Sequence, residues 1–129
     1  MTSRLSISIP SLPPASYGAN KARGAHWGRQ YQDSHGKRGA IEQIKALVLE
    51  QGWQGPALDR ATVTVTFGLP DKRRRDPGGL QERMKPWFDG LVEAGVLTDD
   101  SLKEIGWPCY GHFLSPRKPT TIIEVKDEG

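Results

Sequence analysis

The sequence predicts an α+β fold, in which a mixed β-sheet of about four strands packs against two main helices. Two stretches, residues 4–9 and 61–69, alternate apolar and polar residues with the period of a strand. Two others, 37–51 and 80–92, repeat apolar residues every three or four positions, as amphipathic helices do. A chain of 129 residues fits one domain, 1–129, that buries roughly two-thirds of its unfolded surface.

The first predicted strand covers residues 4–9, where Leu5, Ile7 and Ile9 alternate with polar residues and Pro10 follows. The next stretch, 11–36, shows no period and is rich in Pro, Gly, Asn and Ser, so we expect a loop there. So long a loop in a small domain is usually either functional or disordered.

This loop carries cationic and aromatic side chains of the kind that hold a DNA backbone and stack on exposed bases. The candidates are Asn20, Lys21, Arg23, His26, Trp27, Arg29 and Tyr31. Trp27 and Tyr31 can equally be core or loop-anchoring aromatics, and a lone histidine is more often structural. The interpretation as a DNA contact therefore depends on Lys21, Arg23 and Arg29.

Apolar spacing predicts the first long helix from Lys37 to Gln51, and Gly52 stands where a C-terminal cap would. The second strand, 61–69, reads ATVTVTFGL and is built from strong strand formers. Pro70 ends it, so a basic run emerges at the strand's end, where sheets tend to place ligand sites. This run consists of Lys72, Arg73, Arg74 and Arg75.

The second helix pattern contains Pro86 and ends at Gly95, a predicted cap. Proline is tolerated in the first turn of a helix and costs roughly 3 kcal/mol deeper inside one. Either the regular helix begins near Lys85 with an irregular lead-in at 80–84, or it bends at Pro86. A brief extended piece then leads to the paired carboxylates that follow Thr98.

Residues 102–114 mix aromatic residues with Pro108 and two glycines, which predicts an irregular or edge strand. The stretch 120–126, TTIIEVK, predicts a further strand, and 115–119 the turn before it. Cys109 is the only cysteine, which excludes an intrachain disulfide and argues against a zinc site. We interpret it as a structural thiol.

The charge is mildly basic overall but locally concentrated. Lysine and arginine number 18 against 15 acidic residues, giving a net charge of +3, and the isoelectric point is near 9.2. No apolar run approaches the roughly 20 residues of a membrane span, and the N-terminus lacks the apolar core of a signal peptide. We therefore expect a soluble, cytoplasmic protein without a membrane partner.

Residues 69–100 place charges of opposite sign around one helix. The basic run directly precedes Asp76, and Asp99 and Asp100 close the segment. Basic side chains can hold a phosphate backbone, and carboxylates brought together by a fold can hold Mg²⁺, which activates water at a phosphodiester. Taken singly, a basic run is more often a solvated loop, and an aspartate pair a turn or cap.

Together, these segments resemble the RusA family of Holliday junction resolvases. The resemblance rests on RRRD at 73–76, KPWFDGLVEAGVLTDD at 85–100, and PSLPPAS, Asn20, Arg23 and His26–Trp27 upstream, and it runs from about Ile7 to the C-terminus. It implies a RusA-like fold and a homodimeric endodeoxyribonuclease of bacterial or bacteriophage origin. Such an enzyme cuts branched DNA, here a four-way junction, with Mg²⁺ and possible use of Mn²⁺.

The resemblance also implies residue roles. Asp76 matches the first aspartate of a D-x-D-N-L segment, and the metal ligands would be Asp76, Asp100 and Asp99, with Asp100 preferred over Asp99. Lys85 would lie near the reacting phosphate, where a cation offsets developing negative charge. Rigid counting from Asp76 would place this lysine at Glu82, and we anchor the register on the downstream FDGL instead. The DNA contacts would be Lys21, Arg23, Arg29 and the basic run.

The chain departs from the family pattern at one likely metal ligand. Gly78 stands where the second aspartate would be, and Gly79 replaces the asparagine. Glu82 is a hypothetical substitute ligand if the chain bends back, whereas Asp89 is expected to pair with Lys85 or to cap structure. The alternative function is therefore a catalytically weakened, RusA-like protein that binds DNA structure without cutting it.

Overall fold

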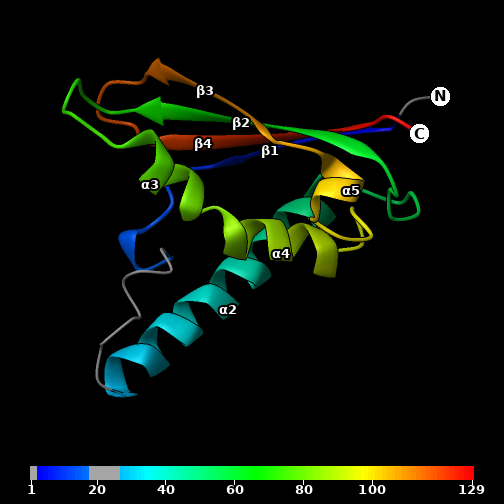
Figure 1. Cartoon of the computed structure of the whole chain (residues 1–129), viewed down its shortest axis with the longest axis horizontal. Coiled ribbons are helices and arrows are strands. Elements are labelled where there is room, and N and C mark those ends of the chain that lie inside the picture. Colours follow the sequence, from blue (N-terminus) through cyan, green and yellow to red (C-terminus); the bar gives the residue numbers. More distant parts are fainter. Residues whose placement is uncertain (1–2, 18–26) are drawn as a thin grey trace.

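The protein is built around a four-stranded sheet with the strand order β1-β4-β2-β3 (Figure 1). The computed structural model describes the backbone of residues 3–17 and 27–129, and the side chains of 3–17 and 36–129. The strands are β1 (Arg4–Ile9), β2 (Ala61–Leu69), β3 (Cys109–Leu114) and β4 (Thr120–Asp127). Strand β3 runs parallel to β2 and the other neighbours are antiparallel, so the predicted mixed sheet is confirmed.

Strands β1 and β2 form where the sequence alternates, because every second side chain reaches the same face of the sheet. The buried side of β1 consists of Leu5, Ile7 and Ile9, and that of β2 includes Val63, Val65 and Phe67. The edge strand β3 is mostly exposed, including Cys109, whose thiol is free. The thiol predicted to be structural thus lies at the surface.

The helices lie on one side of the sheet (Figure 1). They are the 3₁₀ turn η1 (Ala15–Tyr17) and the helices α2 (Trp27–Glu50), α3 (Pro77–Glu82), α4 (Lys85–Glu93) and α5 (Leu102–Ile105). Helices α2 and α4 pack closely at Gly90, where a Cβ would lie 2.6 Å from Cβ of Ile44. No helix in the described parts of the chain has the length and apolarity needed to cross a bilayer.

Both glycine caps predicted from the sequence are present. Gly52 and Gly95 have φ angles of 74° and 81°. After α2, Trp53 N–H donates to Val48 O and Gly52 N–H donates to Leu49 O. After α4, Val96 N–H donates to Leu91 O and Gly95 N–H donates to Val92 O in the same way. These are the two bonds of a Schellman motif, which a left-handed residue permits.

The predicted loop at 11–36 is wrong in its second half, because α2 begins at Trp27, ten residues before the predicted start at Lys37. Those residues lack an apolar period, but each one added to an existing helix gains a backbone hydrogen bond without a new nucleation cost. Candidates Asn20, Lys21, Arg23 and His26 lie outside the described residues. The side chains of Trp27, Arg29 and Tyr31 also lie outside the described residues. The DNA contacts proposed for these residues therefore stay predictions.

The remaining differences concern short helices. The regular helix does begin at Lys85, with Pro86 in its first turn, as one of the two alternatives proposed. Its expected irregular lead-in is a separate helix, α3, which Asp76 caps and Pro77 starts. Within 102–114, the first four residues form α5, and only Cys109–Leu114 is the predicted edge strand.

Candidate active site

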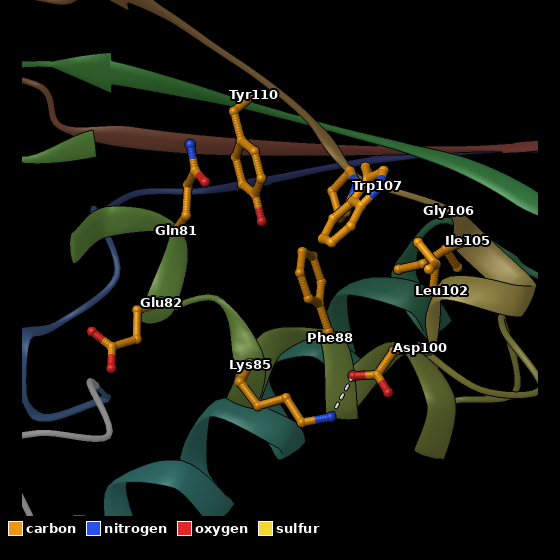
Figure 2. Close-up of a pocket in the computed structure, with 11 residues that line it drawn as sticks. Gln81, Glu82, Lys85, Phe88, Asp100, Leu102, Ile105, Gly106, Trp107 and Tyr110 are labelled. Atoms are coloured by element: carbon orange, nitrogen blue, oxygen red, sulfur yellow. Dashed lines mark hydrogen bonds and ion pairs between the residues drawn. The ribbon is translucent and has the colours of Figure 1, made fainter. Parts of the chain in front are cut away.

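A groove of about 660 Å³ lies between the helices and the inner face of β3. Helices α3 and α4 and the segment around α5 line it on one side, and Tyr110 of β3 on the other (Figure 2). The polar side chains in its lining are Gln81, Glu82, Lys85 and Asp100, and the large apolar or aromatic ones are Phe88, Leu102, Ile105, Trp107 and Tyr110. Its volume lies within the roughly 300–1,000 Å³ typical of ligand sites.

The charged part of the groove is an ion pair between residues 15 positions apart. Lys85 Nζ donates to Asp100 Oδ2 at 2.7 Å. It also lies 3.1 Å from Asp89 Oδ1, and this second pairing is the one expected from the sequence. The Asp100 side chain is 11% exposed and that of Lys85 is 63% exposed. The bond to Asp100 raises the pKa of Lys85, burial opposes this, and Asp89 adds to it.

The position of Lys85 is electrostatically unusual. It is the first residue of α4, where the partial positive charge of a helix N-terminus disfavours a cation, and the N-cap residue Met84 has no side-chain cap bond to offer. Asp89 and Asp100 offset this cost. A lysine and a helix N-terminus together form a site suited to an anion.

Asp100 reaches Lys85 because the chain reverses after α4. Gly95 ends the helix, and the following Val96 and Leu97 are buried. This segment is fixed to the chain before β2, since Leu58 N–H donates to Val96 O at 2.8 Å and Thr98 N–H to Leu58 O at 3.0 Å. Asp100 thus returns beside the start of the helix that it follows.

The other two aspartates make local hydrogen bonds. Asp76 accepts from Gly78 N–H at 3.1 Å as the N-cap of α3, and Asp99 accepts from Asp100 N–H at 2.8 Å. Asp76 does not line the groove: it caps the start of α3, whereas Gln81 and Glu82, which do line the groove, stand at the end of that helix, and six helical residues span about 9 Å. The structure therefore brings Lys85 and Asp100 together, and Asp76 with neither of them.

Glu82 lines the groove, but its carboxylate points away from the ion pair (Figure 2). Among the described residues, no group of three or more histidine, cysteine, aspartate or glutamate side chains is arranged to hold a metal ion. A cation here would depend on one or two carboxylates, with water and substrate phosphates completing its shell, as Mg²⁺ often does. Asp100 fits such a ligand set.

The basic run forms a loop organised by Asp71. Asp71 pairs with Arg75 at 3.0 Å and with Arg73 at 3.3 Å, and it accepts a hydrogen bond from Arg73 N–H. That backbone bond is the main reason why the pKa of Asp71 is lowered. The Arg75 guanidinium also donates to backbone carbonyls and is only 17% exposed, so it holds the loop together, whereas Lys72, Arg73 and Arg74 are exposed.

A second hollow, of about 250 Å³, extends the groove toward this loop. Arg73 and Arg75 contribute to its lining, and it shares Gln81 and Tyr110 with the groove. Burial raises the pKa of Tyr110 above its ordinary value. The lining thus runs from the Lys85–Asp100 pair to the basic loop.

Two further cations were missed by the sequence reasoning. Arg117 and Lys118 lie in the turn between β3 and β4, and this turn is bonded to the basic loop's base: Ser115 N–H donates to Leu69 O and Arg117 N–H to Pro70 O. Figure 1 shows the two loops at the same end of the sheet. Both cations are exposed. The only signal in the sequence was SPRKP, which predicts a turn and not a site.

Trp107 was also missed, because within 102–114 it was interpreted as part of an irregular strand. It is 83% exposed and lines the groove (Figure 2).

A scan of protein-family models finds no match to this chain, and a search of curated proteins finds no significant one either. The function of this chain is therefore inferred from its site.

Proposed function

We propose that this chain is a metal-dependent endodeoxyribonuclease that cuts branched DNA, with a Holliday junction as the reference substrate. The observation that carries the proposal is the Lys85–Asp100 pair, at 2.7 Å, in a groove whose lining continues to a basic loop. A cation and a carboxylate side by side are the groups needed to hold a phosphate and a metal at one point. The resemblance of residues 69–100 to RusA resolvases supports the same reaction.

In this proposal the DNA backbone lies along the basic loop and enters the groove. Lys72, Arg73 and Arg74 contact phosphates, while Arg75 keeps the loop in shape through Asp71. Such contacts give affinity and orientation without reading sequence. Exposed cations at one end of the sheet therefore position the scissile phosphate beside Lys85.

At the ion pair, Lys85 would exchange its carboxylate partner for the phosphate, and Asp100 would then be free to hold the metal. Asp99, the next residue, is the second candidate ligand, and Asp76 contributes only if α3 shifts from its observed position. Bound Mg²⁺, or Mn²⁺ in its place, would activate water and stabilise charge on the phosphodiester. Lys85 would remain charged and offset the negative charge that develops on the phosphate.

We further propose that the chain acts as a homodimer in recombination and repair. A two-fold symmetric enzyme presents two sites to the two-fold pseudo-symmetric four-way junction and nicks it symmetrically. The mass of the protein in solution, measured by light scattering, tests this: a monomer at working concentration, with and without junction DNA, contradicts the dimer.

A second candidate function is structure-specific DNA binding without cleavage. Two observations favour it. The Asp76 carboxylate already accepts the cap hydrogen bond of α3, and position 78 is a glycine, so few carboxylates remain for a metal site in the described part of the chain. Loss of a carboxylate weakens a metal site but leaves cationic contacts to phosphate in place. Both candidate functions use the same surface to bind DNA, and they differ only in whether the bound DNA is cut.

The test is incubation with a labelled four-way junction and a linear duplex of the same sequence, at low salt, in Mg²⁺, Mn²⁺ or EDTA. Paired, metal-dependent nicks confined to the junction support the nuclease. Asp100→Asn should then reduce cleavage at least about 100-fold with junction binding kept. Glu124→Gln, a change to an exposed carboxylate on β4, is the control and should leave cleavage unchanged. Junction binding without cuts in either metal contradicts the nuclease.

A further inference from the structure

The feature that the proposed reaction leaves unexplained is Trp107. At 83% exposure it is the most exposed of the large apolar side chains in the described parts of the chain. Tryptophan is usually largely buried, so an isolated exposed ring of this size is an unusual surface feature. Leu102, which is 57% exposed, lines the same groove.

The backbone around Trp107 holds the ring at the rim of the groove. Gly106 ends α5 with a φ angle of 61°, and its N–H donates to Leu102 O at 2.9 Å. Pro108 follows, which fixes its own φ and restricts the conformation of the tryptophan before it. The ring is therefore presented from a short, constrained segment between α5 and β3.

The groove beside this ring is aromatic. Phe88 of α4 is buried and lines the groove, and Tyr110 of β3 stacks on Phe67 with ring centroids 6.1 Å apart and planes 8° apart. In Figure 2 the Tyr110 hydroxyl points into the groove, and Phe88 projects from α4 toward the Trp107 side. Tyr110 and Trp107 lie toward β3, the Lys85–Asp100 pair lies on the α4 side, and Phe88 of α4 projects between them.

This division matches the two parts of a nucleotide. An anionic phosphate suits the Lys85 side, and the flat face of a base suits the aromatic side. A base inside a duplex is already stacked on both faces, so only an unpaired or flipped base can use such a platform. The Tyr110 hydroxyl, which points into the groove, is available to hydrogen-bond the edge of that base.

We propose that the aromatic half of the groove binds one unpaired nucleobase, stacked on Trp107, next to the phosphate held by Lys85. The preferred substrate is therefore a branched DNA that carries an unpaired nucleotide at its branch point. The choice of DNA as the ligand rests on the proposed function, but base stacking does not require cleavage.

The experiment compares two four-way junctions with the same arms, one fully paired and one with two unpaired thymidines at the branch point. Binding to the full chain is measured by fluorescence anisotropy in EDTA, so that no cutting occurs. Wild type should bind the junction with unpaired thymidines roughly tenfold more tightly, the size expected for one stacked base. Trp107→Ala should remove this preference with affinity for the paired junction unchanged, and Trp107→Phe should keep most of it.

The control is Leu49→Ala, which removes an equally exposed apolar side chain from α2 outside the groove and should keep the preference. Thermal unfolding of each variant verifies that the fold is kept. Equal affinity of wild type for the two junctions, or an undiminished preference in Trp107→Ala, overturns the base site.

The same substrates in Mg²⁺ separate this inference from the nuclease proposal. A Trp107-dependent preference in EDTA without any cleavage in metal keeps the base site and contradicts the nuclease. Cleavage of both junctions by wild type, without a binding preference, keeps the nuclease and contradicts the base site.

Discussion

At the scale of single residues, Lys85 is the side chain on which the proposed chemistry depends. It contacts two carboxylates but is 63% exposed, and ion pairs at the surface contribute about 0–1 kcal/mol. A large effect of its removal on activity would therefore reflect contact with the substrate. Its place at the start of α4, unfavourable for a cation, is consistent with selection for function over stability.

We expect Lys85→Met to reduce junction cleavage at least about 100-fold while changing stability little. Because the pKa of Lys85 is raised by folding, its stabilising contribution is fully present below the unfolded value near 10.5 and is lost as pH rises through the folded value. The difference in unfolding free energy from wild type should thus stay constant between about pH 6 and 9. Denaturant titrations at a series of pH values measure this difference in unfolding free energy. The control is Lys126→Met, which removes a lysine from an exposed position on β4.

Gly78 offers a gain-of-function prediction at the residue scale. A Cβ at this position would meet only Asp76 Oδ1, at 3.5 Å, an ordinary contact. Gly78→Asp would place a second carboxylate beside Asp76, at the position where the resemblance to RusA resolvases implies an aspartate, with the favourable helix N-terminus partly offsetting the repulsion. We expect tighter Mn²⁺ binding by calorimetry, and Gly78→Asn should not produce it. Unchanged Mn²⁺ affinity in the aspartate variant would show that this position cannot contribute to a metal site.

At the scale of elements, the crossing of α2 and α4 positions Lys85. Gly90 of α4 packs on Ile44 of α2 so closely that a methyl group would meet Cβ and both γ carbons at 2.6 to 3.0 Å. The Cβ of Ile44 cannot rotate away, so the two helices would have to separate. The start of α4, which carries Lys85, would move with them.

Gly90→Ala should therefore destabilise the protein by about 1–3 kcal/mol through overpacking, seen as a lower midpoint in thermal or urea unfolding. The matched control is Gly39→Ala in α2, where a Cβ would meet nothing within 4 Å. Alanine is the better helix former, so this change should stabilise by about 0.5–1 kcal/mol. Equal effects of the two substitutions would contradict the close crossing.

At the scale of the whole molecule, cations from two distant parts of the chain gather at one end of the sheet. The loop at 71–75 and the turn at 115–118 are held together by backbone hydrogen bonds to Leu69 and Pro70. The net charge of the chain is only +3, but these cations are concentrated on one part of the surface.

We expect this surface to contribute phosphate contacts that are insensitive to sequence. Replacing both Arg117 and Lys118 by alanine should weaken junction binding and reduce the slope of log affinity against log salt by about 1 to 2, because each lost phosphate contact removes about 0.9 from the slope. Binding titrations from low to moderate salt measure the slope. Lys126→Ala removes a cation from β4 instead, and an equal loss there would indicate a general charge effect.

Local patterns in the sequence were sufficient for much of the fold. Alternation fixed β1 and β2, apolar spacing fixed the C-terminal half of α2, and glycines marked the ends of α2 and α4, because each of these is decided by neighbours within a few residues. The N-terminal half of α2 was not predictable in this way. It has no apolar stripe of its own and extends a helix nucleated elsewhere.

The tertiary structure decided which candidate residues meet. The carboxylates at 76 and 100 were equivalent in the sequence, yet only Asp100 reaches Lys85, because the chain reverses at Gly95 whereas α3 lies between Asp76 and the lysine. Trp107 and the turn at 115–118 gave no signal of function, since their meaning depends on a groove and a loop that come from distant parts of the chain. Sequence spacing determined the elements, and the packing of those elements determined the candidate site.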